Sequence, residues 1–143
     1  MRTHSRSTVL GTALLSLVAC TEAVAPTRDV TITPKSSQIS LADALTSGIP
    51  ATFANHTKAS VLVQASFCSS GGVSLERAVL TGWQPLPSPL IYCTAIMAPQ
   101  PVSVAPGDSL DVWPSTNGVV VGRYRMRLPS TGGEAVSGAF EVR

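Results

Sequence analysis

The chain has 143 residues, of which 44% are hydrophobic and 13% charged, with 11 prolines and 11 glycines. Ten lysines and arginines stand against eight aspartates and glutamates, and two of those cations, Arg2 and Arg6, lie within residues 1–19. The rest of the chain is therefore balanced at eight charges of each sign, which excludes the strong basic footprint of general nucleic-acid binding. Few charges, together with many small, β-branched and proline residues, are typical of an all-β domain.

The first segment has the layout of a secretory signal. Arg2 and Arg6 form a positive start, an apolar run of about 11 residues follows, and small residues then lead into Cys20. A bilayer needs roughly 20 apolar residues to be crossed, so an uncleaved transmembrane anchor is disfavoured. Cleavage after residue 19 is predicted, and an ordinary secretory signal cut near Ala19 or Ala25 is the alternative.

Leu17-Val18-Ala19-Cys20 resembles the lipobox of bacterial lipoproteins. The resemblance implies that Cys20 becomes the first residue of the mature chain and carries diacylglycerol and fatty acyl groups such as palmitate. It also implies export and attachment to a membrane of the cell envelope, since two or more acyl chains give stable anchoring. Thr21 stands where an Asp often marks inner-membrane retention, which favours the outer membrane, at its periplasmic face or the cell surface. Residues 20–29 are polar and contain proline, and they predict a short tether.

Residues 30–143 are predicted to form one domain of short strands joined by turns. The expected strands cover 30–33, 38–41, 49–54, 60–67, 73–80, 90–96, 102–105, 110–113, 119–128 and 135–142. Prolines at 85, 87 and 89 predict a stiff connection that is not a central strand, and residues 41–45 fit one turn of helix. Strands of this length and spacing predict a β-sandwich or a small barrel.

Cys68 and Cys93 remain as a pair once Cys20 is assigned to lipid. In an oxidising compartment they are predicted to form a disulfide, which closes a loop of about 25 residues and is worth about 3 kcal/mol in the chain-entropy model. The alternatives are two free buried thiols or a metal site. A metal is disfavoured because His56 is the sole histidine after the signal and no CxxC or HxxxH spacing occurs. Neither a metal nor a cofactor is expected.

Gly122-Arg123-Tyr124-Arg125 resembles the tyrosine corner of Greek-key sandwiches, in which the tyrosine hydroxyl bonds to nearby backbone. More broadly, residues 46–143 resemble bacterial immunoglobulin-like domains of exported lipoproteins. The matching positions are Asn55, Cys68, Gly82-Trp83, Cys93, Pro106-Gly107, Gly122-Arg123-Tyr124-Arg125 and Ser137-Gly138-Ala139-Phe140-Glu141-Val142. The resemblance implies an immunoglobulin-like antiparallel β-sandwich and no common activity. One departure is Trp83, which adjoins a proline-rich segment, whereas antibody-type domains place this residue on an inner strand.

Arg123, Arg125 and Arg127 alternate with apolar residues, so they share one face of a strand over about 13 Å. One interpretation is an anion-binding stripe for phosphate, anionic glycan or an acidic partner, because guanidinium groups suit these ligands. The favoured interpretation is a solvated outer face whose arginines pair across the sheet with Glu141 and Glu134.

Trp83 and Trp113 lie beside prolines in expected loops. Aromatic anchors dominate many contact surfaces, so these segments are candidates for a binding rim for glycan or peptide. The favoured alternative is that both indoles pack over the end of the sandwich.

Evidence for catalysis in the sequence is weak. The chain contains the residue types of a Ser-His-Asp triad, with His56 as the histidine, but no Gly-x-Ser-x-Gly motif accompanies them. Asp108 and Asp111 lack the spacing of a calcium loop. The sequence therefore favours a non-catalytic binding or structural module at the cell envelope, with an envelope protein or a glycan as partner. The alternative is a secreted proteinase inhibitor that acts through a protruding loop over residues 80–90, and a hydrolase dependent on His56 is a third hypothesis.

Overall fold

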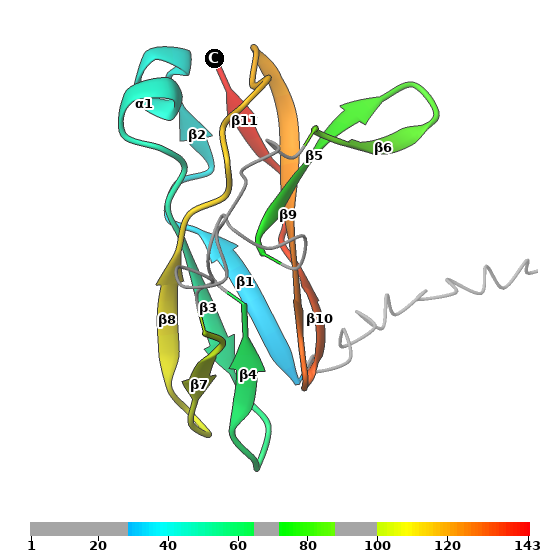
Figure 1. The fold of residues 1–143 in the computed structure, drawn as a ribbon. Coiled ribbons are helices and arrows are strands. Elements are labelled where there is room, and N and C mark those ends of the chain that lie inside the picture. Colours follow the sequence, from blue (N-terminus) through cyan, green and yellow to red (C-terminus); the bar gives the residue numbers. More distant parts are fainter. Residues whose placement is uncertain (1–28, 65–71, 88–99) are drawn as a thin grey trace, which may run out of the picture.

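A computed structural model describes residues 29–64, 72–87 and 100–143, which fold into two packed β-sheets (Figure 1). In chain order the elements are β1 (Val30–Pro34), β2 (Gln38–Ile39), α1 (Leu41–Thr46), β3 (Ala51–Asn55), β4 (Val61–Val63), β5 (Ser74–Val79), β6 (Gly82–Pro85), β7 (Val102–Val104), β8 (Ser109–Val112), β9 (Gly122–Ser130), β10 (Gly133–Val136) and β11 (Phe140–Val142). The predicted all-β sandwich is confirmed. The strand expected over 90–96 and the end of the one expected over 60–67 lie outside the described residues.

The smaller sheet has the order β1-β3-β8, and both ladders are antiparallel. Its inward residues alternate along each strand, as the period of two requires. Val30 and Ile32 of β1 and Ala51 and Phe53 of β3 are all buried. This sheet therefore supplies one half of the hydrophobic core.

The larger sheet is built around β9, its longest described strand. One edge of β9 pairs with β11 and then with β10, and the other edge pairs with β5 and then with β4. Tyr124, Met126 and Leu128 point inward and are fully buried, so the arginines between them point outward.

Two details of the larger sheet differ from the sequence-based expectation. The strand expected over 135–142 is two strands, because Ser137 interrupts the ladder where the edge of β9 passes from β10 to β11. The buried Ser137 hydroxyl accepts a hydrogen bond from the Met126 N–H at 2.8 Å and donates one to the Gly138 carbonyl at 2.7 Å. In addition, β2 pairs with β11 in parallel, because the chain crosses from the smaller sheet to the larger one after β1.

Tyr124 forms the corner that its motif predicted. Its hydroxyl donates to the Val120 carbonyl at 2.8 Å and accepts from the Val120 N–H at 3.1 Å. Its ring is fully buried and lies 6.1 Å from the ring of Phe140, centroid to centroid. One side chain thus fills the core and fixes the loop that enters β9.

The one helix within the described residues, α1, follows the expected helical turn and is capped by Ser40. The Ser40 hydroxyl accepts from the Asp43 N–H at 3.0 Å, which satisfies one of the free donors of the first turn. Ala44 is buried, and Leu45 on the other side is 55% exposed. The helix therefore covers one end of the sandwich and leaves an apolar side chain in solvent.

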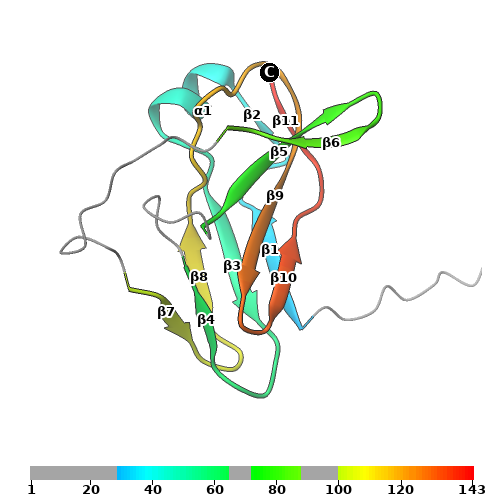
Figure 2. The same ribbon diagram turned by 45° about the vertical axis from the view of Figure 1, so that its right-hand side comes forward.

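The two ends of the sandwich differ in what they carry (Figures 1 and 2). The described chain enters at β1, beside the β9–β10 turn, where a Cβ on Gly132 would lie 3.2 Å from Val30. The opposite end carries α1, the segment 113–121 and the β5–β6 hairpin. A tether that precedes Val30 thus leaves from the end opposite the hairpin.

Asn55 closes the turn after β3 with a fully buried side chain. Its Nδ2 donates to the carbonyls of Ala59 and Val104 at 2.8 and 2.9 Å, and its Oδ1 accepts from the Thr57 N–H at 2.9 Å. All the polar atoms of this amide are therefore used in joining two strands of different sheets to one turn.

We expect Asn55→Ala to lower the free energy of unfolding by about 1–3 kcal/mol, because it leaves buried backbone groups unpaired. Urea denaturation measures the change, and Lys58→Ala in the same turn is the control, since Lys58 is exposed. Equal losses for the two variants would contradict the role assigned to the amide.

Candidate functional site

The most prominent surface feature is the β5–β6 hairpin, which projects from the larger sheet (Figures 1 and 2). Val79 pairs with Gly82, so the apex consists of Leu80 and Thr81. Gly82 has φ +133°, a conformation that favours glycine in such a turn. Leu80 is fully exposed and Val79 is 40% exposed. The hairpin thus presents an apolar apex to solvent.

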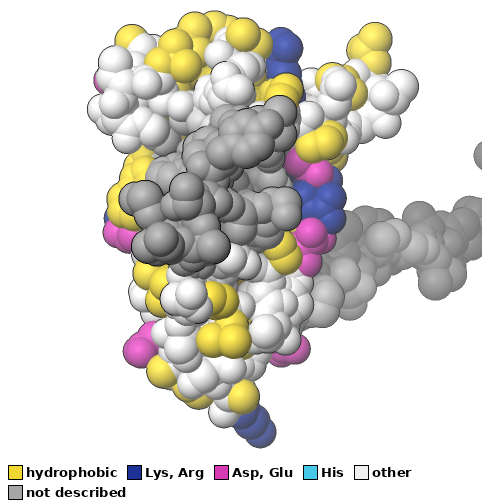
Figure 3. Space-filling view, in the orientation of Figure 1, with side chains coloured by type: hydrophobic (Ala, Val, Ile, Leu, Met, Phe, Trp, Pro, Cys, Tyr) yellow, Lys and Arg dark blue, Asp and Glu magenta, His cyan; other side chains and the backbone are white. Residues whose placement is uncertain are grey.

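Hydrophobic side chains also gather at the end of the molecule where α1 lies (Figure 3). Exposed large apolar residues at this end are Leu45, Val79, Leu80, Trp113, Val120 and Val121. Exposed apolar side chains that gather in one region mark interaction surfaces more often than scattered ones do. We call this region, defined by those six residues, the hairpin end.

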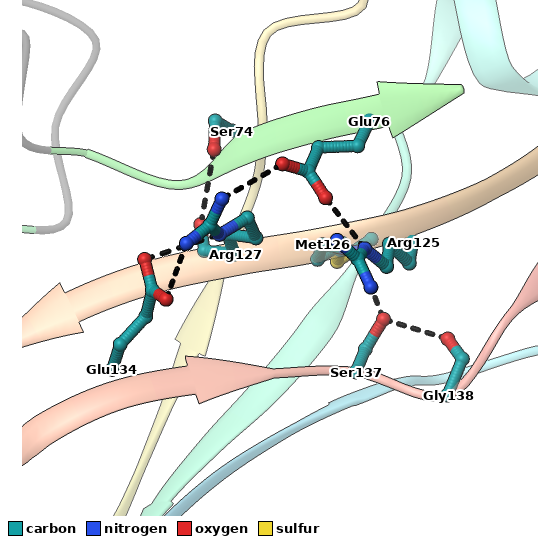
Figure 4. A network of polar contacts seen from close by, with 8 residues as sticks. All are labelled: Ser74, Glu76, Arg125, Met126, Arg127, Glu134, Ser137 and Gly138. Atoms are coloured by element: carbon teal, nitrogen blue, oxygen red, sulfur yellow. Dashed lines mark hydrogen bonds and ion pairs between the residues drawn. The ribbon is translucent and has the colours of Figure 1, made fainter. Parts of the chain in front are cut away.

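A polar network on the outer face of the larger sheet fixes the base of the hairpin (Figure 4). Glu76 of β5 pairs with two arginines of β9, with Arg125 Nε at 2.5 Å and Arg127 Nη1 at 3.0 Å. Arg127 Nη2 also lies 2.5 Å from Glu134 Oε2 on β10. Three strands are therefore tied together by four alternating charges.

Glu76 is buried although it lies on an outer face, with 4% of its surface exposed. Desolvation by burial raises the pKa of its carboxyl, but hydrogen bonds from Arg127 and Arg125 and their positive charges outweigh this, so the pKa lies below its ordinary value. Glu134 and Glu76 together raise the pKa of Arg127. The network therefore holds a charged carboxylate in place.

Acidification below about pH 4.5 should lower the free energy of unfolding through this carboxylate. Because the folded pKa of Glu76 lies below its ordinary value of 4.5, the unfolded chain takes up the proton more readily. The stabilisation is therefore complete above that value and is lost as the pH falls through the folded pKa. The pKa of Asp111, lowered mainly by a hydrogen bond from Lys35 and next by one from Thr52, acts in the same direction.

Urea unfolding between about pH 7 and about pH 3 measures this dependence. The acid-induced loss should be shallower in Glu76→Gln than in the wild type. An identical pH profile for the two proteins would show that Glu76 is not a source of the dependence.

Trp83 adds a contact between the hairpin and the body of the protein. Its ring lies beneath the Arg125 guanidinium, with Arg125 Cζ 4.7 Å from the ring centroid, and the indole is half-buried. Such a cation–π contact is worth about 0.5–2 kcal/mol. Trp83 thus ties β6 to β9 from outside the core. The stiff segment expected from Pro85 starts within β6, an edge strand, where proline is tolerated.

The three arginines share one face, as their alternation predicted, but they differ in their partners. Arg125 and Arg127 are ion-paired, and Glu134 is a partner as expected. Glu141 lies opposite Arg123 in the ladder but pairs its carboxylate with Arg143 at 2.6 Å. Within the described residues, the Arg123 side chain is exposed and has no ion-pair or hydrogen-bond partner.

The structure does not bring Trp113 to Trp83. Trp113 follows β8 and is 45% exposed, and its ring lies beside Gly48, where an added Cβ would be 3.5 Å from Cδ1. Trp113 therefore belongs to the apolar surface near α1, whereas Trp83 belongs to the base of the hairpin. The two indoles do not form one aromatic rim.

The candidates for catalysis and metal binding have structural partners. His56 Nε2 lies 3.0 Å from the Thr31 hydroxyl, and Asp111 bonds Lys35 and Thr52. Asp108 accepts from the Asn55 N–H through its backbone carbonyl at 3.0 Å. Among the described residues, no three His, Cys, Asp or Glu side chains are grouped so that they could hold a metal ion.

Several sequence predictions fall on residues that the structure does not describe. These are the signal over 1–19, Cys20 and most of the tether, and the Cys68–Cys93 pair. In the described part of the chain, no helix is long and apolar enough to cross a membrane. Comparison with models of known protein families and with curated proteins finds no match for this chain.

Proposed function

We propose that this protein is a lipid-anchored, exported binding module of the cell envelope, and that its hairpin end is the contact surface. The anchor is Cys20, exposed by removal of residues 1–19, and the binding domain is an immunoglobulin-like sandwich. The proposal for the anchor rests on the charged start, the apolar run and the lipobox-like Leu17-Val18-Ala19-Cys20.

The observation that carries the proposal is the exposed apex of the β5–β6 hairpin. Leu80 stands fully in solvent, and Val79 beside it is 40% exposed. Burying a leucine side chain in a partner is worth about 1.5–3 kcal/mol, and an anchor of this kind is most effective on a rigid support. Glu76 and Trp83 provide such a support, because both tie the hairpin to β9.

The positions of the chain entry and of the hairpin end, at opposite ends of the domain, also support this role. The chain enters the sandwich at Val30, and the hairpin end lies at the other extreme (Figures 1 and 2). A lipid anchor upstream of residue 29 therefore leaves the apolar end facing away from the attachment point. A module built in this way presents its contact surface to molecules that lie away from the membrane to which it is anchored.

Two experiments test the proposal. Intact mass of the protein extracted from membranes should include lipid on Cys20, and Cys20→Ala should release the protein from the membrane fraction. A mature chain without lipid on Cys20 would contradict the proposed membrane anchor.

The second experiment is chemical crosslinking in intact cells, followed by recovery of the anchored protein. A specific adduct should disappear in Leu80→Asp and persist in Leu62→Asp, because Leu62 is an exposed leucine away from the hairpin, on β4, at 47%. An adduct that persists in Leu80→Asp would place the contact surface elsewhere.

A proteinase inhibitor remains a second candidate function, because the projecting Leu80 also suits insertion into an enzyme cleft. Purified protein assayed against serine, cysteine and metallo-peptidases distinguishes the two. Inhibition that is lost in Leu80→Asp would favour the inhibitor. No inhibition of any class would remove it and leave the binding module.

A further inference from the structure

The segment between β8 and β9 carries an exposed asparagine followed by glycine, Asn117-Gly118. The Val119 N–H donates to the Thr116 carbonyl at 3.1 Å, so the pair occupies the central positions of a tight turn. Gly118 has φ +76°, which is typical of the second central residue of a type II turn. The turn belongs to the end of the sandwich that carries α1 and the β5–β6 hairpin (Figures 1 and 2).

An asparagine in front of a glycine can lose its side-chain amide without an enzyme. The backbone nitrogen of the glycine loses its proton and attacks the asparagine Cγ, and the side-chain NH2 leaves with that proton as ammonia. Water then opens the resulting five-membered imide at one of its two carbonyls, and the product is aspartate or isoaspartate. The attacking nitrogen must be accessible and the backbone must rotate, and glycine favours both because it has no Cβ.

Few contacts hold the reacting groups of this turn. The Asn117 N–H donates to Ser115 Oγ at 3.3 Å, but within the described residues the Asn117 side-chain amide has no hydrogen-bond partner. The Gly118 N–H is likewise unbonded in the part of the chain that the structure describes. A Cβ on Gly118 would lie 3.9 Å from Pro87 Cδ, so the turn is not tightly packed at this point. Rotation of the peptide between Asn117 and Gly118, which ring closure needs, is therefore opposed by little beyond the backbone hydrogen bond across the turn.

The other asparagine, Asn55, is in the opposite situation. It is fully buried, and its Nδ2 and Oδ1 make three hydrogen bonds. The nitrogen that would attack at this position belongs to His56, and its N–H donates to the Asp29 carbonyl at 2.9 Å. The amide of Asn55 is therefore enclosed by the fold, and the backbone nitrogen after it is bonded. Asn55 and Asn117 are the asparagines of this chain, so one is an internal control for the other.

We propose that Asn117 is a site of spontaneous modification, at which the folded protein converts a side-chain amide into aspartate or isoaspartate while Asn55 stays intact. Water is the co-reactant and ammonia is the leaving group, so the reaction needs no enzyme, metal or oxidant. Either product adds a negative charge to the turn. Isoaspartate also lengthens the backbone by a methylene, because the chain then runs through the side-chain carbon.

The new charge arises beside exposed apolar side chains of the hairpin end. Val120 and Val121 follow the turn and are 43% and 56% exposed. Burying a charged group in an apolar contact carries a desolvation cost. The modification should therefore weaken contacts of the hairpin end as the protein ages. This consequence rests on the proposed function, whereas the modification of Asn117 does not.

The test is incubation of the purified, folded protein in detergent at neutral pH over weeks, followed by peptide mapping with mass spectrometry. The peptide that contains Asn117 should gain the mass difference between an amide NH2 and a hydroxyl, and it should separate into aspartate and isoaspartate forms. Methylation by an isoaspartyl methyltransferase identifies the second form. The peptide that contains Asn55 should keep its mass.

Asn117→Gln is the matched control, because it keeps an amide but would have to close a larger and less favourable ring. This variant should show no isoaspartate over the same period. Asn117 that keeps its amide in the folded protein would overturn the inference, because it would show that the fold protects the turn. Modification of Asn55 at the same rate as Asn117 would also overturn it.

Crosslinking in intact cells separates this inference from the proposed function. Asn117→Asp carries the charge of the product, so the adduct that depends on Leu80 should weaken in Asn117→Asp and persist in Asn117→Gln. An adduct of equal strength in both variants would reject the effect on binding. Modified Asn117 in a protein that gives no adduct at all would contradict the proposed function and support the modification site.

Discussion

Replacing Arg125 and Arg127 together by methionine should lower the free energy of unfolding by about 3–5 kcal/mol. The reason is that the Glu76 side chain, 5% exposed, would keep its charge and lose both cations. A solvent-exposed network would lose about 1 kcal/mol or less, so the size of the change distinguishes a buried charge from a surface ion pair. Urea denaturation at about pH 7 measures the change.

A third substitution provides the control. Adding Glu76→Leu to the double variant removes the uncompensated carboxylate, and it should recover most of the lost stability because apolar replacements of buried ion pairs are often neutral or stabilising. If the triple variant is as unstable as the double variant, packing of the arginine stems, and not the charge of Glu76, would account for the loss.

Tyr124→Ala should have a comparably large effect, about 3–5 kcal/mol, because it removes a fully buried ring that packs on Phe140. Tyr124→Phe should cost about 1–3 kcal/mol, since it keeps the ring but leaves the N–H and carbonyl of Val120 without the tyrosine hydroxyl. Thermal or urea unfolding of the two variants separates the ring from the hydroxyl.

The neighbouring Arg123→Ala is the matched control, because that side chain is exposed, and a change within about 0.5 kcal/mol is expected. Wild-type stability in Tyr124→Phe would mean that the corner hydrogen bonds do not stabilise the fold. The segment 113–121, which carries part of the hairpin end, would then be held by its other contacts, such as the hydrogen bond from Arg77 to the Val121 carbonyl.

Local patterns in the sequence predicted those parts of the fold that depend on neighbouring residues. The Gly-x-Tyr motif predicted the bonds of Tyr124 to nearby backbone, and the bond to Val120 spans four residues. The alternation of 123–128 predicted which side chains face outward. Residues 41–45 predicted one helical turn, and the structure has a six-residue helix there.

Contacts between distant strands could not be predicted in the same way. Glu76 is 49 positions from Arg125, and the pairing depends on the register of β5 against β9, which no local pattern specifies. The same holds for the end of the β5–β9 ladder, at Arg77 opposite Tyr124. The alternation of residues along this strand could indicate that Glu76 lies on the outer face of the sheet. It could not indicate which arginines pair with Glu76.

The most direct test of the hairpin end as the contact surface is a photo-crosslinking amino acid placed at Leu80 of the membrane-anchored protein in intact cells, with the same group at Leu62 as the matched position. Both leucines are exposed, and they lie on the hairpin and on β4 respectively. We expect a discrete adduct from position 80 that is absent from position 62 and is lost when Cys20→Ala detaches the protein. Equal labelling from the two positions, or an adduct from position 62 alone, would contradict the hairpin end as the contact surface.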